Sequence, residues 1–249
     1  MYQVGIDIGS SAAKTVVLRD GEVWKTMEMA TGFSSRKTAE EIYHRLEKEQ
    51  VTHEKSRYGA TGYGRVSVPY ADKVITEITC HGKGAWKLFG KDGVVIDIGG
   101  QDTKGIVLKS GRVMKFVMND KCSAGTGKFL EVMTNRLGLT QKELSELASQ
   151  GKDVTISSMC TVFAESEVIS LIGKGTSRED IAYGVVESVA VKVAQLISQL
   201  GGNHYFLTGG LCEDEYVISR LSHALNAPVE SMPLARYAGA IGAALLSGE

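Results

Sequence analysis

The feature that most constrains how this chain folds is an internal duplication. Residues 4–23 align with residues 94–113 at a constant offset of 90, without a gap, and ten of the twenty aligned positions are identical. Each copy has the pattern of a buried strand, a tight glycine turn and a second strand. Because only two copies exist, the duplication predicts two similar subdomains rather than a repeat array.

The turn in each copy has the features of a phosphate site. Glycine has no Cβ atom, so the backbone N–H groups at Gly9 and at Gly99 and Gly100 can approach an anion closely. Asp97 and Asp102, beside the second turn, carry oxygens that suit a magnesium ion or orient a water molecule against a phosphate. One such turn is common in hairpins, whereas two of them predict a clamp for a polyphosphate.

The composition excludes several classes of partner. The chain has 249 residues and a formal net charge of −1, so it does not indicate a nucleic acid or an anionic membrane as a partner. No apolar run approaches the ~20 residues of a membrane span, and no signal-like segment precedes the first strand. The four cysteines include no C-x-x-C pair and do not indicate a disulfide framework. We therefore expect a cytoplasmic protein that binds neither nucleic acid nor membrane.

Local signals place the secondary structure. Capping-box spacing predicts helix starts at Thr38, Thr140 and Thr176. Gly90 and Gly138 are predicted C-caps. The other predicted elements are strands within residues 1–30 and at 56–60, a helix over 77–89, a helix that carries Phe163 and ends at Gly173, a strand at 205–207, and a closely packed helix of small residues over 238–246.

A third glycine turn, Gly209–Gly210, follows the predicted strand at 205–207. Three strand–glycine turns in one chain resemble the ATPase fold of actin, hexokinase and Hsp70. The resemblance implies an α/β fold with two intertwined actin/RNase H-like subdomains and a nucleotide cleft between them. The implied subdomains are residues 1–91 plus 234–249, and residues 92–233 with the cluster cysteines.

The same resemblance implies roles for individual residues. The two duplicated hairpins would grip the β- and γ-phosphates, and the Gly209–Gly210 turn would receive the adenosine. Magnesium and the attacking water would be managed, directly or through bound waters, by Asp7, Asp97, Gln101 and Asp102. The residues implied in ATP binding are Ser10, Ser11, Ala12, Ala13, Lys14, Gly99, Gly100, Gln101, Gly125, Gly127, Gly209, Gly210 and Arg236.

Two of the cysteines have the surroundings of metal ligands. Cys122 and Cys160 are each predicted to lie immediately before a helix, where partial positive charge and free N–H groups favour a thiolate. Thiolates are the usual ligands of iron–sulfur clusters. Two are too few for a cluster that needs four, and a twofold dimer would complete the set. For Cys80 and Cys212 we expect small buried residues, and for His81 a core or helix-start histidine.

Four segments resemble one family in particular, the activators of 2-hydroxyacyl-CoA dehydratases among the BadF/BadG/BcrA/BcrD-type ATPases. The wider family includes the ATPase subunits of benzoyl-CoA reductase. The resemblance implies an ATP-dependent one-electron donor, a homodimer with one [4Fe–4S] cluster at its interface. The implied ligands are Cys122 and Cys160 of each subunit. The four segments are residues 76–85, 97–102, 118–127 and 160–170.

The resemblance also implies cofactors and partners. A reduced ferredoxin or flavodoxin would supply the electron, ATP with Mg²⁺ would drive a hinge motion, and a dehydratase or reductase component would accept the electron. Arg236 departs from the family, in which Gln is common near the adenine, although arginine can stack on a purine. Two alternatives stay open: a small-molecule kinase of the same fold, of the sugar or pantothenate type, and a nucleotide-sensing regulator. The sequence identifies neither the partner enzyme nor its substrate.

Overall fold

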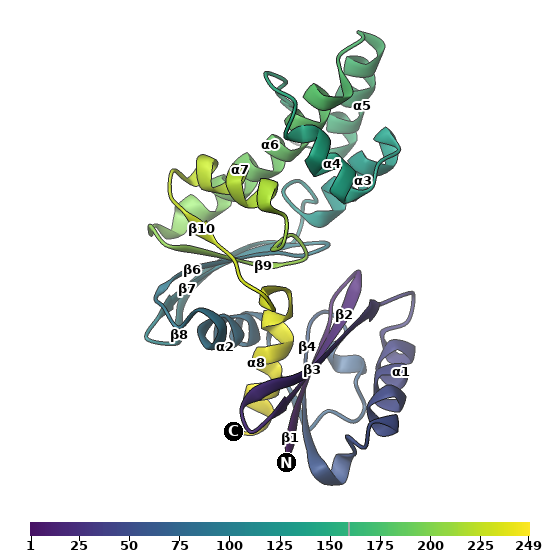
Figure 1. Ribbon diagram of the computed structural model, residues 1–249, viewed down its shortest axis with the longest axis vertical. Helices are drawn as coiled ribbons and strands as arrows, with labels where there is room; N and C mark the ends of the chain where they lie inside the picture. Colours follow the sequence, from purple (N-terminus) through teal and green to yellow (C-terminus); the bar gives the residue numbers. More distant parts are fainter. Residues whose placement is uncertain (159) are drawn as a thin grey trace. The chain divides into compact units, whose positions relative to one another are not determined.

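The computed structural model describes residues 1–158 and 160–249, which form an α/β fold on two five-stranded sheets (Figure 1). The first sheet contains β1 (Tyr2–Ile8), β2 (Ala12–Arg19), β3 (Glu22–Ala30), β4 (Ser56–Thr61) and β5 (Lys73–Val74). The second sheet contains β6 (Gly93–Ile98), β7 (Thr103–Lys109), β8 (Arg112–Asn119), β9 (Tyr205–Gly209) and β10 (Val229–Glu230).

Helices connect and cover the strands. The α-helices are α1 (Ser35–Lys48), α2 (Glu77–Phe89), α3 (Gly127–Leu137), α4 (Gln141–Ala148), α5 (Thr161–Gly173), α6 (Arg178–Ile197), α7 (Glu215–Leu225) and α8 (Ala238–Ser247). Short 3₁₀ helices occur at η1 (His53–Lys55), η2 (Arg65–Ser67), η3 (Ser198–Leu200) and η4 (Ala235–Tyr237).

The two sheets have the same strand order. The first runs β3-β2-β1-β4-β5, and the second, read from its other edge, runs β8-β7-β6-β9-β10. In the first sheet β1 is antiparallel to β2 and parallel to β4, and in the second β9 is parallel to β10. The predicted duplication is therefore confirmed, and it extends to β4 and β9, which lie outside the aligned residues.

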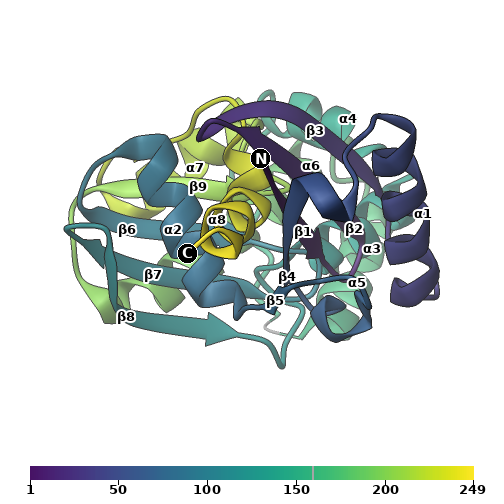
Figure 2. The same cartoon turned by 90° about the horizontal axis from the view of Figure 1, so that it is seen from below.

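Helices pack on both faces of the first sheet. Successive side chains of a strand point to opposite faces, and β2 follows this rule. Val17 belongs to the core cluster that contains Ile42 of α1, whereas Val16 and Leu18 belong to the cluster that contains Ile241 of α8. Figure 2 shows α1 and α8 on opposite sides of this sheet.

The helix of small residues at 238–246 packs as closely as predicted. A Cβ atom built on Gly242 of α8 would lie 1.8 Å from the carbonyl oxygen of Cys80 in α2. Only a residue without a side chain allows the two helix backbones to approach this closely. The glycine and alanine content of α8 is thus a consequence of its packing.

Some of the predicted helix caps are confirmed and others are wrong. Thr140 and Glu143 form the predicted capping box of α4, and Gly90 and Gly138 end α2 and α3 in the left-handed conformation. The caps predicted at Thr38 and Thr176 are wrong, because the chain enters these helices at serines in extended conformation, one of them four residues before Thr38 and the other directly after Thr176. The observed N-caps are Ser34, which accepts from Lys37 N, and Ser177, which accepts from Asp180 N.

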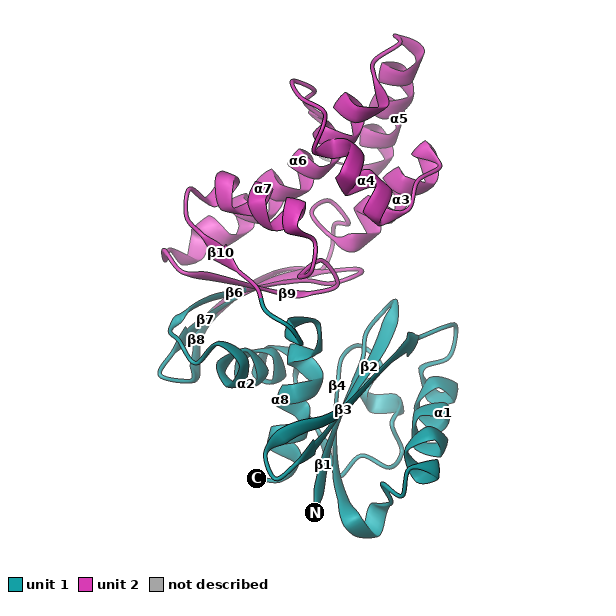
Figure 3. Ribbon diagram, viewed as in Figure 1, with its two compact units in different colours: residues 1–95, 106–115, 232–249 teal, residues 96–105, 116–231 magenta. Residues whose placement is uncertain are grey.

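The chain forms two compact units (Figure 3). Unit 1 consists of Met1–Val95, Ile106–Lys115 and Met232–Glu249, and unit 2 of Ile96–Gly105 and Phe116–Ser231. The backbone passes from one unit to the other within β6, β7 and β8, and once more between Ser231 and Met232, after β10. The division at residues 91/92 and 233/234, which follows from the resemblance, stays a prediction.

α6 is the core helix of unit 2. The stretch Arg178–Leu200 is, among the described residues, the one long and apolar enough to cross a membrane by length and composition. However, 56% of its most apolar window is buried inside the protein, including Ile181, Val185 and Val189. Its hydrophobic character is therefore explained by packing within unit 2.

Candidate functional site

The first glycine turn joins β1 to β2 in unit 1. Gly9 N donates to the carbonyl of Ala12 at 3.1 Å, which closes the turn. Thr31 then fixes the turn from the end of β3, because its Oγ1 donates to Gly9 O at 2.8 Å and its N donates to Ser11 O at 3.0 Å. Within the turn, Ser11 is exposed and Ser10 is half-buried. The predicted phosphate residues therefore stand on a turn whose backbone is held in place.

Asp7 lies at the end of β1, in a narrow space in unit 1. Its Oδ2 atom is 3.9 Å from Nε2 of the buried His81, so this histidine is a core residue beside the aspartate. A Cβ atom on Gly239 would lie 2.4 Å from Asp7 Oδ2. Lys14 stands opposite Asp7 in the register of β1 and β2. The absence of a side chain at Gly239 is thus a requirement of the carboxylate position.

The second glycine turn, in unit 2, repeats the first. Gly99 N donates to Asp102 O at 2.9 Å, which matches the bond from Gly9 to Ala12 at an offset of 90. Lys104 differs from its counterpart Lys14, because its ammonium is buried between two carboxylates. Lys104 Nζ is 2.7 Å from Asp102 Oδ2 and 3.5 Å from Asp97 Oδ2.

Asp97 is held from two sides. Thr208 Oγ1 donates to Asp97 Oδ1 at 3.1 Å, while Lys104 lies at its other oxygen. Asp97, Asp102 and Lys104 are each about 3% exposed. A buried carboxylate is strongly destabilising without such compensation. Sequence reasoning identified both aspartates as site residues but assigned no role to Lys104, which fixes their orientation.

A fourth glycine turn, at residues 61–65, is predicted from the sequence as a turn but was not assigned to the candidate site. Gly209 has φ +86°, and a Cβ atom there would lie 2.5 Å from Ile98 O and 2.9 Å from Asp97 Oδ1. Gly62 has φ +87°, and its Cβ atom would lie 2.4 Å from Ile8 O and 2.5 Å from Asp7 Oδ1. The shared signal is a Thr-Gly pair that ends a buried strand, Thr61–Gly62 and Thr208–Gly209.

The start of α3 rests on the second glycine turn. Gly127 N donates to Gly99 O at 2.9 Å, and Lys128 N donates to Gly100 O at 2.8 Å. Gly125, with φ +80°, precedes this helix and accepts a 2.6 Å hydrogen bond from Thr103 Oγ1. The structure thus brings four predicted residues of unit 2 together, namely Gly99, Gly100, Gly125 and Gly127.

The remaining predicted residues differ in how far they are exposed. Gln101 and Gly210 are exposed, and a Cβ atom at Gly210 would have no neighbour within 4 Å. Ala12 is half-buried and Ala13 is buried within β2. Arg236 lies in η4 of unit 1, where its Nη1 is 3.2 Å from Glu28 Oε2 on β3. This ion pair directs the guanidinium toward β3.

The four cysteines separate into two classes. Cys80 and Cys212 are buried, as predicted, whereas Cys122 and Cys160 are exposed. Burial raises the pKa of the Cys80 thiol to about 12, so this thiol is not a ready ligand. Cys160 is the N-cap of α5, as predicted. The prediction for Cys122 is wrong, because it lies in the loop between Asn119 and Gly127, five residues before α3.

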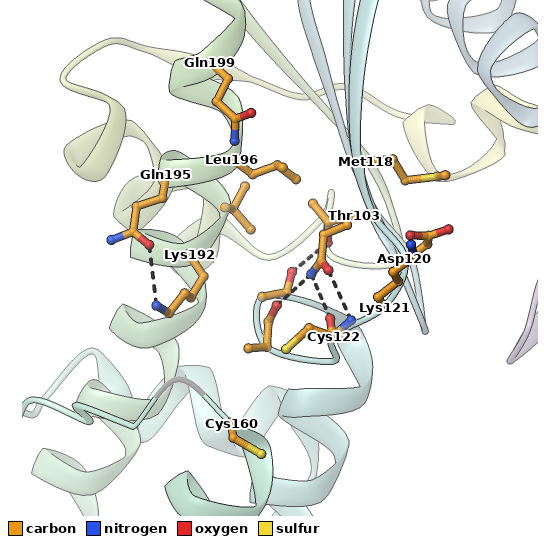
Figure 4. A pocket seen from close by; sticks show the side chains of 14 residues that line it. Thr103, Met118, Asp120, Lys121, Cys122, Cys160, Lys192, Gln195, Leu196 and Gln199 are labelled. Carbon is orange, nitrogen blue, oxygen red and sulfur yellow. Dashed lines mark hydrogen bonds between the residues drawn. The ribbon is translucent and has the colours of Figure 1, made fainter.

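Both exposed cysteines line one cavity of unit 2, with a volume of about 560 Å³ (Figure 4). The wall across from Cys122 is formed by α6, on which Lys192 donates to Gln195 Oε1 at 3.5 Å. The other lining residues are Thr103, Met118, Asn119, Asp120, Lys121, Ala124, Gly125, Val193, Leu196 and Gln199. The cavity therefore reaches from the cysteines to the residues that contact the second glycine turn.

Hydrogen bonds hold the two cysteine segments together. Asn119 Nδ2 donates to Cys122 O at 2.7 Å, and Cys122 N donates to Asn119 Oδ1 at 3.2 Å. Ser123 Oγ and Thr161 Oγ1 share a 2.7 Å hydrogen bond, which links the residue after Cys122 to the residue after Cys160. No group of three or more His, Cys, Asp or Glu residues suited to a metal ion occurs within residues 1–158 and 160–249. The described part of one chain thus offers two thiols rather than a complete ligand set.

Known proteins resemble this chain over nearly its full length. It is 43% identical to the (R)-2-hydroxyglutaryl-CoA dehydratase activating ATPase of Acidaminococcus fermentans, over 98% of this chain and 96% of that protein. The crystal structure of the A. fermentans (R)-2-hydroxyglutaryl-CoA dehydratase component A superimposes with a TM-score of 0.93 at 41% identity, over all of both chains. The activator of the 2-hydroxyisocaproyl-CoA dehydratase from Clostridium difficile, with bound ADPNP, has a TM-score of 0.92 at 35% identity, covering 99% of this chain and 94% of that one.

These likenesses confirm the fold class predicted from the glycine turns. The profile of the BadF/BadG/BcrA/BcrD ATPase family matches residues 4–247, which include both duplicated hairpins, both exposed cysteines and α8. The chain belongs to the BadF/BadG/BcrA/BcrD ATPase family.

Proposed function

We propose that this protein is an ATP-dependent one-electron donor that activates a 2-hydroxyacyl-CoA dehydratase or a related reductase. Family membership and the names of its relatives support the activator role. The observation that carries the proposal is the separation of the cysteines: two are exposed in one cavity and two are buried elsewhere. Phosphoryl transfer by a kinase of the same fold, the alternative activity, requires no pair of thiols.

The nucleotide would be bound by the two glycine turns. Ser10, Ser11 and Lys14 in unit 1, with the turn at Gly99–Gly100 in unit 2, would bind phosphate oxygens through N–H, hydroxyl and ammonium donors. Asp7, Asp97, Gln101 and Asp102 would hold Mg²⁺ and orient the attacking water. Lys104 and Thr208 support this role, because they fix the Asp97 carboxylate before any ligand arrives.

The exposed cysteines fit a cluster shared between two copies of the chain. Cys122 and Cys160 of each protomer in a homodimer would supply four thiolates to one [4Fe–4S] cluster, which stores and releases a single electron. Asn119 and the Ser123–Thr161 contact orient the two ligand segments within a chain. A reduced ferredoxin or flavodoxin would deliver the electron, and the cytoplasm supplies the reducing conditions that keep these thiols free.

Coupling would follow the contacts of unit 2. The second glycine turn contacts α3 through Gly127 and contacts the Cys122 loop through Thr103 and Gly125. A change in the turn on ATP binding or hydrolysis would therefore alter the surroundings of Cys122. The dehydratase or reductase component would receive the electron in one of the resulting states.

The test uses full-length protein purified without oxygen. We expect iron and sulfide to approach four each per dimer, MgATP to be hydrolysed, and a 2-hydroxyacyl-CoA dehydratase to gain activity when this protein, ATP and a low-potential reductant are all present. Omission of any one of the three should abolish the gain. Iron-free protein after reconstitution, or transfer of phosphate to a sugar or pantothenate, would overturn the proposal.

A further inference from the structure

The carboxylate of Glu167 accepts hydrogen bonds from two adjacent serines. Ser157 N donates to both oxygens at 3.1 Å, and Ser158 N donates to Oε2 at 3.0 Å. Ser157 Oγ lies 3.1 Å from Oε1 and Ser158 Oγ lies 2.8 Å from Oε2, and both hydroxyls donate. Two backbone and two side-chain donors therefore converge on one half-buried carboxylate of α5.

These bonds hold the end of a segment that contains no helix or strand and whose earlier part is held to α6 at Lys152, where Lys152 N donates to Asp180 Oδ1 at 2.9 Å. Between the end of α4 at Ala148 and the N-cap Cys160, the described residues form no helix or strand. The side chain of Ile156 is buried and anchors the middle of this segment. Beyond Ile156, the described hydrogen bonds to Ser157 and Ser158 are those of Glu167, and such charge-assisted bonds are stronger than neutral ones.

We infer that Glu167 is a positioning residue for Cys160. Its carboxylate ties the backbone that approaches Cys160 to the second turn of the helix that follows Cys160. Ser157 and Ser158, which precede Cys160 in the chain, are thereby held to the helix that Cys160 caps. This inference rests on the proposed function, in which Cys160 is a ligand of the cluster.

The environment of Glu167 suits this role. Burial raises the pKa of Glu167, but hydrogen bonds from Ser157 and Ser158 outweigh this effect and hold the pKa below its ordinary value. The side chain therefore stays a hydrogen-bond acceptor at neutral pH. Groups that orient metal ligands typically change metal affinity by about 10–100-fold when they are removed. A glutamate that only added negative charge near Cys160 would not need four donors on its two oxygens.

Glu165 provides a matched control on the same helix. It is two residues from Glu167 and pairs with Arg136 of α3, with Arg136 Nε donating to Oε1 at 2.9 Å. Glu165→Gln and Glu167→Gln remove the same charge from α5. They differ in that Glu167→Gln replaces one acceptor oxygen by an amide donor facing the serine N–H and O–H groups.

The experiment has two readouts on full-length protein. Hydrogen exchange at the Ser157 and Ser158 amides of the cluster-free protein reports the contact itself. Release of iron to a chelator from the anaerobically reconstituted dimer reports the consequence at the cluster. We expect E167Q to accelerate exchange at both amides and iron release about 10-fold or more, and E165Q to stay within about twofold of the wild type in both. Ser157→Ala combined with Ser158→Ala tests the same contact if E167Q fails to fold, and it should give an intermediate effect because the N–H donors remain.

The outcomes separate this inference from the proposed function. Wild-type protein that holds no iron would defeat the proposed function, whatever the exchange data show. Faster exchange in E167Q with unchanged iron release would mean that the contact exists but does not position Cys160. Equal acceleration of iron release by E165Q and E167Q would assign the effect to charge alone, and would also overturn the inference.

Discussion

Thr103 Oγ1 donates a 2.6 Å hydrogen bond to the carbonyl oxygen of Gly125. Thr103 is the first residue after the turn that contains Gly99 and Asp102, and Gly125 lies three residues after Cys122. The bond is buried and lies inside unit 2. It joins the residue that follows the proposed phosphate turn to the loop of a proposed cluster ligand.

Removal of this bond should weaken the coupling between nucleotide and cluster. Coupling free energies of about 1–3 kcal/mol are typical, and ~1.4 kcal/mol corresponds to about 59 mV for a one-electron couple. We expect an ATP analogue to shift the cluster potential of the wild type by tens of millivolts and to shift that of Thr103→Val by less. Redox titrations with and without the analogue measure both shifts. Superimposable wild-type curves would show that nucleotide and cluster are not linked.

Loss of a charge at the glycine turns should strongly slow ATP hydrolysis without loss of the fold. Asp97→Asn keeps the 2.7 Å ion pair of Lys104 with Asp102, so the structure should persist. Removal of one preorganised charge from a phosphoryl-transfer site costs on the order of 10²-fold or more in rate. We expect this loss of Mg²⁺-dependent ATPase turnover for Asp97→Asn and for Lys14→Ala. Unchanged turnover in both variants would remove these turns from the catalytic site.

The duplicated lysines should differ in their contribution to stability. Lys104→Met removes the buried cation that lies between the carboxylates of Asp97 and Asp102, and should lower the free energy of unfolding by about 3–5 kcal/mol. Lys14→Met changes a half-buried side chain and should cost less than about 1 kcal/mol. Urea unfolding of nucleotide-free protein provides the comparison. Equal costs for the two variants would contradict the structural role given to Lys104.

Iron content should follow cysteine exposure. We expect Cys122→Ser and Cys160→Ser each to remove the iron, since both thiols are exposed in the same cavity. Cys80→Ala and Cys212→Ala should retain it, because those side chains are buried. Iron and sulfide analysis of anaerobically reconstituted dimers decides the matter. A monomer with a full cluster, or a requirement for Cys80, would refute the shared site.

The Glu167 contact should appear in the acid dependence of stability. Hydrogen bonds from Ser157 and Ser158 outweigh the opposite effect of burial and lower its pKa below the ordinary 4.5. An acid with a lower pKa in the folded chain stabilises the fold above its unfolded pKa, and this stabilisation is lost as the pH falls through the folded pKa. Cluster-free wild type should therefore lose more stability than E167Q as the pH falls below about 5 and through the folded pKa of Glu167. Parallel pH curves for the two proteins would contradict this.

Much of the fold could be predicted from local patterns. The alignment of residues 4–23 with 94–113 predicted two related hairpins, and the two sheets indeed share one strand order. Glycines at the ends of α2 and α3 were identified because the left-handed conformation favours that residue type. The burial of Cys80 and Cys212 followed from the ordinary behaviour of isolated cysteines.

Other features were decided by contacts between residues far apart in the chain. Gly62 lies against Asp7 because β4 packs beside β1 in the first sheet. Lys104 forms ion pairs with Asp97 and Asp102 because all three side chains are buried together in unit 2. The N-cap of α1 is Ser34 rather than the predicted Thr38, and Cys122 lies in a loop rather than immediately before a helix. In each case the local sequence was compatible with more than one placement of the residue, and long-range packing selected one of them.

From the sequence alone, the duplicated aspartates and glycines and two thiols could be identified as candidates for the chemistry. Which other side chains support these candidates depended on the tertiary structure, as in the contact of Glu167 with Ser157 and Ser158. The physical reason is that hydrogen bonds and ion pairs depend on distance in space. Within one helix or hairpin, the spacing of two residues along the chain specifies their distance in space. Between residues of different elements, that distance is specified by packing.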